Sequence, residues 1–266
     1  MRTFSLFLFL ACLLFSCNNA PKGDAETAEQ TEENQEQITK KYILTPFTPS
    51  QAYPDARIES MDYQDGTFSF EVSGENYELG EQTPDAGTKM CANSAEGQHI
   101  HLIIDNAPYA AKYVAEFEHE VAEGDHYLLA FLSRSYHESI KTEEAHIAKK
   151  VTVKDKAITY GADIEDPMLF YSRPKGNYVG EADTKKIMLD FYLINAELGK
   201  DYTVKAEING EEHMIDKWQP YYIEGLPMGE NTIRLTLLDA EGNPAEVPLN
   251  PVTRKFKLEA DPAESN

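Results

Sequence analysis

The chain has 266 residues, which is enough for one large domain or two domains of ordinary size. Its 46 Asp and Glu residues outnumber its 24 Lys and Arg residues and give a formal net charge of −22. This charge argues against binding to nucleic acid and against electrostatic adhesion to anionic lipid.

The start of the chain predicts export. The apolar run from Phe4 to Phe15 is too short to span a bilayer as a stable helix and has the form of a signal peptide. It ends in Leu14-Phe15-Ser16-Cys17, which resembles a bacterial lipobox, the signal for lipidation of the cysteine. We therefore expect residues 1–16 to be a lipoprotein signal peptide and Cys17 to carry the lipid. The alternative is a plain secretory peptide without lipid.

The residues after the cysteine predict a tether and a location. Asn18 at the second mature position resembles the signal for release to the outer membrane. Residues 17–40 are acidic, with Ile38 as the one aliphatic residue larger than alanine, and predict a disordered linker. No later segment is apolar enough to span a bilayer, so the expected protein is lipid-anchored at the outer membrane, on its periplasmic or outer face. Cys91 would have no disulfide partner.

From residue 41 onward, short runs alternate apolar and polar residues and end at Gly, Pro, Asn or Asp. Strands are predicted at TFSFEVS (67–73), HIHLIID (99–105), HYLLAFLS (126–133), AKKVTV (148–153), KIMLDFYLI (186–194), DYTVKAEI (201–208), NTIRLTLLD (231–239) and TRKFKL (253–258). The predicted fold class is therefore all-β, built as antiparallel sandwiches.

The second half of the chain repeats the first at a shift of 104 or 105 residues. AEGDHYLLAFLS lines up with PMGENTIRLTLLD, and AKKVTV lines up with TRKFKL. The stretch LPMGENTIRLTLLDAEGN resembles the penultimate strand of many bacterial immunoglobulin-like domains. We therefore expect two tandem immunoglobulin-like β-sandwiches, at 41–157 and 163–260.

The repeat predicts which side chains of the first copy face away from its core. Positions 204, 206 and 208 are apolar and correspond to positions 100, 102 and 104, so His99 and His101 are expected on the outer face. Tyr127, Leu129 and Phe131 are expected beside them. An apolar face of this kind must be covered or used. Residues 73–97 or the second domain can cover it, or it can bind an envelope protein or peptide.

The histidines also suggest a metal site. His99 and His101 point the same way, and Cys91 and His137 can approach them, which gives a donor set suited to copper or zinc. The region resembles a family of periplasmic domains of unknown function with the signature Gly-His-His-His-Leu-Leu-Ile-Asp, followed by a His-rich loop. In this chain Ile100 stands at the middle histidine of that triplet. The alternative is a set of surface or hydrogen-bonded histidines without a cofactor.

Two loops concentrate basic residues and suggest anion binding. One holds Arg134 and His137, and the other holds Arg173 and Lys175, each beside serine hydroxyls that favour a phosphate or carboxylate. The first loop resembles the Ser-Arg-x-His motif of forkhead-associated domains, with one extra residue. The whole chain is similar to flavobacterial (Bacteroidetes) surface lipoproteins sometimes catalogued as phosphopeptide-binding, which implies phosphopeptide binding. The alternative is local pairing with Glu138 or Glu181.

No nucleophile elbow, phosphate loop or histidine-containing triad has a recognisable spacing, so the chain is not expected to be an enzyme. The expected function is non-enzymatic binding or scaffolding at the cell envelope. Phosphopeptide or anion binding is the first alternative, and copper or zinc binding is the second.

Overall fold

A computed structural model describes residues 40–262. The expected signal peptide 1–16, the expected lipidation site Cys17 and the expected tether 17–40, apart from Lys40, lie outside the described residues. None of the described helices is long and apolar enough to cross a membrane.

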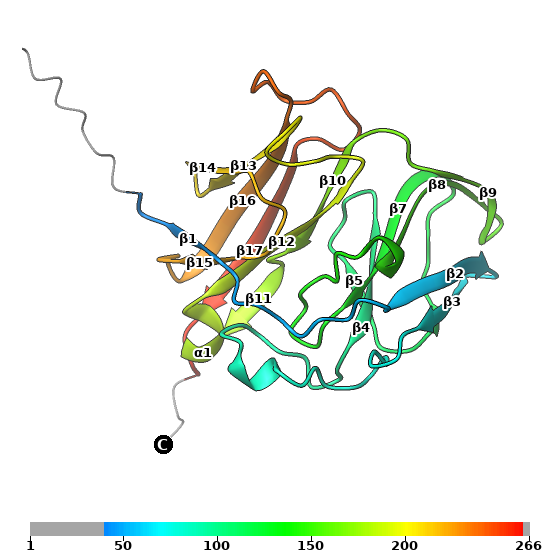
Figure 1. The fold of residues 1–266 in the computed structure, drawn as a ribbon, viewed down its shortest axis with the longest axis horizontal. Helices are drawn as coiled ribbons and strands as arrows, with labels where there is room; N and C mark the ends of the chain where they lie inside the picture. Colours follow the sequence, from blue (N-terminus) through cyan, green and yellow to red (C-terminus); the bar gives the residue numbers. More distant parts are fainter. Residues whose placement is uncertain (1–39, 263–266) are drawn as a thin grey trace, which may run out of the picture. The chain divides into compact units, whose positions relative to one another are not determined.

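The regular secondary structure of the described residues is almost entirely strand, which confirms the all-β class (Figure 1). The first sandwich pairs two sheets. One has the order β2 (Arg57–Gln64), β3 (Thr67–Ser73), β6 (Glu116–Glu118). The other has the order β5 (Ala110–Lys112), β4 (His99–Ile104), β7 (Gly124–Ser133), β8 (His146–Lys154), β9 (Ala157–Asp163). All these pairings are antiparallel.

The second sandwich also pairs two sheets. One has the order β1 (Ile43–Pro46), β15 (Tyr221–Glu224), β12 (Ile187–Ile194), β10 (Met168–Arg173). The other has the order β11 (Gly176–Val179), β17 (Val252–Glu259), β16 (Gly229–Leu238), β13 (Thr203–Ile208), β14 (Glu211–Ile215). Only the pairing of β11 with β17 is parallel among these sheets of the described chain. Short helical turns lie at η1 (Ala86–Thr88), η2 (Glu143–Ala145) and α1 (Glu181–Thr184).

The repeat read from the sequence is present in the strand pairing. Residues 99 to 104 of β4 pair with residues 133 to 128 of β7, and residues 203 to 208 of β13 pair with residues 238 to 233 of β16. The pairing of β7 with β8 recurs in the same way between β16 and β17. Asp105 and Asn209, which correspond, both have positive φ and both accept a backbone N–H through the side chain. One local architecture is therefore used twice.

Two details differ from the expected bounds of 41–157 and 163–260. β1 pairs with β15, so the first described strand belongs to the second sandwich. Residues 157–163, expected to join the domains, form β9 and extend the sheet of the first sandwich. The period-two pattern does not tell which sheet a strand joins, because edge pairing depends on tertiary contacts.

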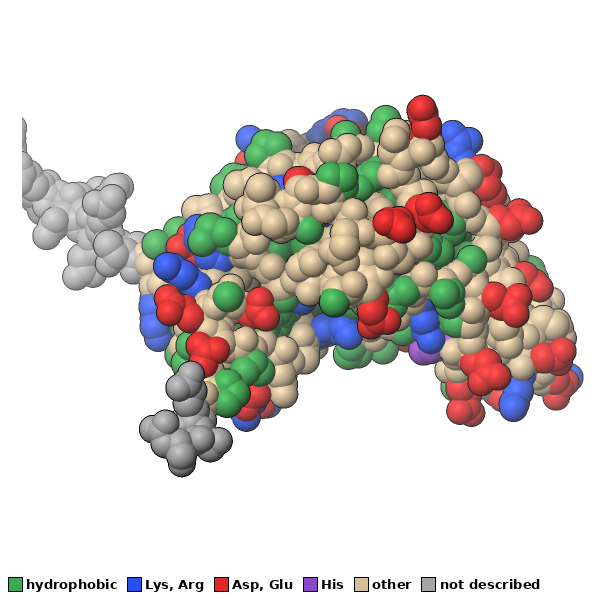
Figure 2. Space-filling view, turned by 90° about the horizontal axis from the view of Figure 1, so that it is seen from below, with side chains coloured by type: hydrophobic (Ala, Val, Ile, Leu, Met, Phe, Trp, Pro, Cys, Tyr) green, Lys and Arg blue, Asp and Glu red, His purple; other side chains and the backbone are tan. Residues whose placement is uncertain are grey.

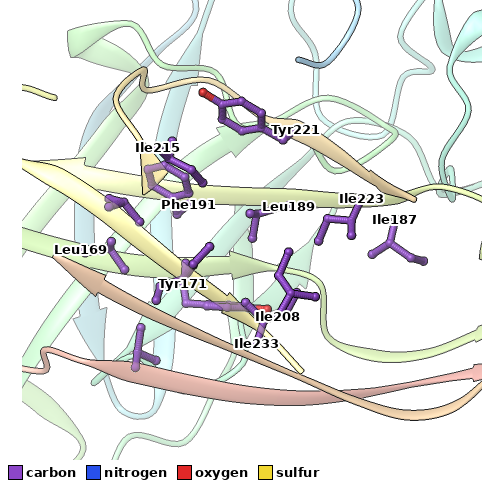
Figure 3. Close-up of a cluster of buried hydrophobic side chains, with 14 of the residues drawn as sticks. Leu169, Tyr171, Ile187, Leu189, Phe191, Ile208, Ile215, Tyr221, Ile223 and Ile233 are labelled. Carbon is purple, nitrogen blue, oxygen red and sulfur yellow. The ribbon is translucent and has the colours of Figure 1, made fainter. Parts of the chain in front are cut away.

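Each sandwich has its own apolar core, and a third cluster lies between them. The core of the second sandwich holds Leu169, Phe191, Ile208 and Ile233, whose side chains face one another in Figure 3. The core of the first sandwich holds Ile100 and Leu102 of β4 together with side chains of β2, β3 and β7. These are Ile58, Tyr63, Phe68, Phe70, Leu128 and Leu132. On the face seen in Figure 2, Asp and Glu side chains stand out at many places, in keeping with the acidic composition.

The third cluster buries the outer face of the first sandwich. Leu129 and Phe131 of β7 are fully buried against Met168, Phe170 and Tyr192 of β10 and β12. The described residues thus form one compact unit in which the outer sheet faces of the two sandwiches pack together.

Candidate metal centre

The candidate site begins in β4, whose side chains alternate between two environments. Ile100 and Leu102 enter the core of the first sandwich, so the rings of His99 and His101 project from the opposite face, as the repeat predicted. Both rings are nevertheless fully buried, because the second sandwich packs over that face. The loop after β7 adds a third ring, that of His137, which is partly exposed.

Three imidazole nitrogens converge at this point. His99 Nε2 lies 2.8 Å from His101 Nε2 and 3.0 Å from His137 Nδ1. One nitrogen from each ring lies within 4.8 Å of the other two. His99 Nδ1 lies 2.8 Å from the carbonyl oxygen of Gly97 and donates its hydrogen there, which leaves a lone pair on Nε2. His101 Nδ1 lies 3.4 Å from Ser172 Oγ.

The backbone of the loop after β7 directs His137 toward the other two rings. His137 has a φ of 67°, in the left-handed region that few residues other than glycine occupy. Its N–H donates to the carbonyl of Arg134 at 2.8 Å, and the N–H of Arg134 donates to the carbonyl of Glu138 at 2.9 Å. Such a backbone costs energy and persists only where the surrounding structure determines it.

Aromatic side chains form the walls of the site. The ring of Tyr109 stacks on His101 with centroids 3.7 Å apart, and its hydroxyl lies 3.4 Å from His137 Nδ1. Tyr113 lies against His99 and Phe131 against His101, with centroids 4.8 and 4.9 Å apart. These rings fix the imidazoles and keep water away from two of them.

Burial keeps the three imidazoles neutral. It lowers the pKa of His99 to about 4 and is also the largest cause that holds the pKa of His101 and of His137 well below the ordinary value. The positive charges of Arg173 and Lys175 act in the same direction on all three rings. Neutral imidazole is the form that binds a metal ion.

The donor set fits a transition-metal ion. Four nitrogens placed around zinc at 2.0–2.1 Å would be ~3.3 Å apart, and the two close separations in the cluster are a few tenths of an ångström shorter. Three histidines with an open fourth position suit zinc or copper. The carbonyl of Gly97 supplies the outer hydrogen bond that commonly orients a ligating histidine.

Cys91, the fourth expected ligand, does not join this group. Its thiol lies 4.0 Å from the carbonyl oxygen of Tyr136, and the converging set contains only the three histidines. Burial raises the pKa of the thiol to about 12, so it is protonated. The expectation failed because spacing alone does not say where a long loop turns its side chains.

The guanidinium group of Arg134 is held by hydrogen bonds within the protein. Its Nε and Nη2 donate to the carbonyl of Gln51 at 2.9 and 2.6 Å, and Nη1 donates to the carbonyl of Ser139 at 3.3 Å. Glu138 lies 3.6 Å away as its ion-pair partner. The residue is buried and these contacts do not favour phosphopeptide binding through Arg134 and His137, which stays a prediction. Pairing with Glu138 was the expected alternative.

Arg173 and Lys175 do lie beside the histidines. The Ser172 hydroxyl that precedes them is the one that contacts His101, and Lys175 Nζ lies 4.0 Å from the ring centroid of Tyr109. Arg173 is buried, with Nε and Nη2 directed at the hydroxyl of Tyr178. The loop of the second sandwich therefore meets the site of the first.

The expected partner surface is covered. Leu129 and Phe131 are fully buried by the second sandwich, and Tyr127 is partly buried. Tyr77 and Leu79, from the connection 73–97, pack on the core of the first sandwich and not over this face. Leu129 and Phe131 thus form an internal junction and cannot be a free docking surface.

Nothing in the sequence indicates Tyr109 and Tyr113 as site residues, and the sequence indicates Ser172 as part of an anion-binding loop and not as a neighbour of His101. Tyr109 and Tyr113 flank β5, the short strand that pairs with β4 directly beside the histidines. A three-residue strand gives too little alternation to be recognised, and Ser172 approaches from a part of the chain 71 residues away.

Comparisons with known proteins gave matches among solved structures only. No family model and no curated protein matched. Fibronectin(III)-like modules of CbhA from Clostridium thermocellum are 16% identical over 36% of this chain and all of theirs, with a TM-score of 0.29. A Ca²⁺-stabilized, ice-binding adhesin of an Antarctic bacterium is 12% identical over 75% of this chain and 45% of its own, with a TM-score of 0.22.

A third similar structure is SGBP-B of the mixed-linkage glucan utilization locus of Bacteroides ovatus, solved with a mixed-linkage heptasaccharide. It is 8% identical over 82% of this chain and 70% of its own, with a TM-score of 0.20. Likeness at these levels does not indicate a shared ligand, because one β-sandwich architecture carries many unrelated functions.

Proposed function

We propose that this chain is a metal-binding module that takes one copper or zinc ion through His99, His101 and His137. The observation that supports it is the convergence of three neutral imidazole nitrogens within 4.8 Å, in a site walled by aromatic rings. A shared cation would give the three converging nitrogens a strong common partner.

The hydrogen bonds around the cluster allow the rings to take a metal without a net change in their ionisation. His99 already holds its hydrogen on Nδ1, toward Gly97. His101 can place its hydrogen on Nδ1, toward Ser172 Oγ, and so turn a free Nε2 lone pair to the ion. Three protein ligands leave one position open for an external ligand.

The remainder of the proposed function concerns location. We infer that acylation of Cys17 holds this module at the outer membrane, because the lipobox-like end of the apolar run precedes an acidic linker. Mass spectrometry of the N-terminal peptide from membranes of a producing Gram-negative cell tests this. We expect the added mass of a diacylglyceryl group on Cys17. The proposal is contradicted if this mass is absent and if the Cys17→Ala variant is cleaved and released in the same way as the unchanged chain.

The metal proposal is tested on protein purified without a histidine tag. Titration with Cu²⁺ and Zn²⁺ is expected to show one high-affinity site, with His101→Gln and His99→Gln each weakening it by two orders of magnitude or more. His119→Gln is the matched control, because His119 lies at the far edge of the first sandwich and outside the cluster. Circular dichroism checks that the variants fold. Stoichiometry below one ion per chain, or equal affinity in all variants, would show a hydrogen-bonded histidine cluster instead.

A further inference from the structure

Two buried arginines of the second sandwich each have one nitrogen without a hydrogen-bond partner among the described residues. Arg173 and Arg254 are 5% and 6% exposed. Arg173 donates through Nε and Nη2 to the hydroxyl of Tyr178, and Arg254 donates through Nη2 to the carbonyl of Asn106 at 2.6 Å. The Nη1 atom of each is buried without a hydrogen-bond partner among the described residues. Buried N–H groups of a charged side chain are costly to leave unpaired.

The charge of these arginines is also uncompensated. Neither Arg173, Arg254 nor the half-buried Lys175 forms an ion pair with any carboxylate of residues 40–262. Their neighbours are aromatic, since Arg173 lies over Tyr178 and Arg254 over Tyr171, at 5.4 and 4.7 Å from the ring centroids. The other arginines of residues 40–262, which are Arg57, Arg134 and Arg234, each form an ion pair with a glutamate.

The fold brings the three cations to one end of the second sandwich. Arg173 ends β10, and Lys175 stands in the turn that leads into β11. β11 pairs with β17, and Gly176 at the start of β11 is opposite Phe256. Arg254 stands two residues before Phe256 in β17. Arg254 lies on the inward face of β17, where its neighbours on either side at alternate positions, Val252 and Phe256, are also buried.

We propose that this end of the second sandwich binds a small oxyanion, a phosphate or a carboxylate group, between the guanidinium groups of Arg173 and Arg254, with Lys175 at the entrance. Arginine binds such groups through paired, charge-assisted hydrogen bonds, and the two free Nη1 atoms supply donors for them. The partial exposure of Lys175 gives the anion a route from solvent. Arg173 and Lys175 were expected from the sequence to bind an anion with Arg134, but Arg254 takes the place of Arg134.

The probes are sodium phosphate and sodium acetate, added at constant ionic strength to the full mature chain and followed by calorimetry and by the melting temperature. Saturable binding of one anion is expected. Arg254→Met, which keeps most of the apolar stem, is expected to weaken it about tenfold or more. Arg234→Met is the matched control, because Arg234 stands on the exposed face of the neighbouring strand β16 and loses the same charge.

A second variant covers the case in which Arg254→Met fails to fold. Lys175→Gln changes a half-buried side chain and is expected to weaken the anion severalfold without unfolding the protein. Tighter binding of phosphate than of acetate would identify a phosphate source, and the reverse a carboxylate source. The proposal is overturned if neither anion binds at millimolar concentration, or if Arg254→Met and Arg234→Met bind it equally.

Discussion

The fully buried carboxylate of Asp190 in β12 lies 2.6 Å from Lys141 Nζ, across the junction of the two sandwiches. Its other oxygen accepts the backbone N–H of Ser139 at 2.9 Å. Lys141 also donates to the hydroxyl of Ser139, and its side chain is 17% exposed. One acidic side chain of the second sandwich thus satisfies a charge and a backbone group of the first.

Removal of this carboxylate is expected to destabilise the whole fold. Asp190→Ala leaves a largely buried ammonium group and a buried N–H without a partner, so the free energy of unfolding should fall by about 3–5 kcal/mol. Urea denaturation measures it. The control is Asp163→Ala, which removes an exposed ion pair with Lys149 and should change stability by about 1 kcal/mol or less. Equal effects of the two substitutions would contradict the assigned role of Asp190.

The apolar junction predicts a second loss of stability. Phe131 is fully buried, stacks on Tyr192 with centroids 5.0 Å apart and also contacts His101. Phe131→Ala should lower the free energy of unfolding by about 3–5 kcal/mol, through lost transfer energy and a new cavity. Tyr160→Ala, at a side chain that is 61% exposed, should change it by about 0.5 kcal/mol or less. A soluble, fully stable Phe131→Ala variant would show that this face is not a core.

A pH-dependent term is expected from His126 and Asp105. Burial alone lowers the pKa of His126, but hydrogen bonds to Asp105 at 2.6 Å and to the carbonyl of Ala122, with the charge of Asp105, outweigh it and raise the pKa. A raised folded-state pKa stabilises the fold below the unfolded pKa of about 6.5, and this stabilisation is lost as pH rises through the folded value.

Asp105→Asn should therefore reduce stability more at pH 5 than at pH 9. The pH-dependent part should be about 1 kcal/mol or less, because Asp105 is 41% exposed. Melting curves of both proteins across this range measure the difference. A gap that widens toward alkaline pH would mean that the sign of the His126 shift is wrong.

Gly97 is predicted to be irreplaceable beside the histidines. Its φ is +91°, and a Cβ there would lie 2.2 Å from the carbonyl oxygen of Gly80. Gly97→Ala should cost about 1–3 kcal/mol and displace the carbonyl that holds His99 Nδ1, so metal affinity should fall as well. Gly87→Ala is the control, because a Cβ there meets no atom within 4 Å. Unchanged stability and affinity in Gly97→Ala would count against the close packing of this turn.

The sequence predicted what depends on local periodicity. The eight predicted strands and the outward direction of His99 and His101 follow from alternation and from the internal repeat, which transfers the facing of residues 204–208 to residues 100–104. It also supplied His137 as the third ring, from its position in the loop after β7.

What the sequence did not predict depends on packing between the two sandwiches. The sequence left open whether the second domain, residues 73–97 or a partner covers Leu129 and Phe131, and the packing decides for the second domain. The approach of Ser172 to His101 and the partnerless Nη1 of Arg254 also arise where distant strands meet. Arg254 shares a face with Phe256 and Leu258 in the run TRKFKL, so alternation gives its inward direction, but no local signal gives the groups that it meets there. Alternation gives a side chain its direction but not its neighbours.

The pairing of β1 with β15 has a mechanical consequence. A force applied to the chain at Lys40 acts first on the pairing of β1 with β15 in the second sandwich. This pairing has four antiparallel residue pairs, from Ile43↔Glu224 to Pro46↔Tyr221. A fragment that starts between residues 163 and 167 would lack β1 and so would lose one strand of the second sandwich. The two sandwiches should therefore be expressed as one chain.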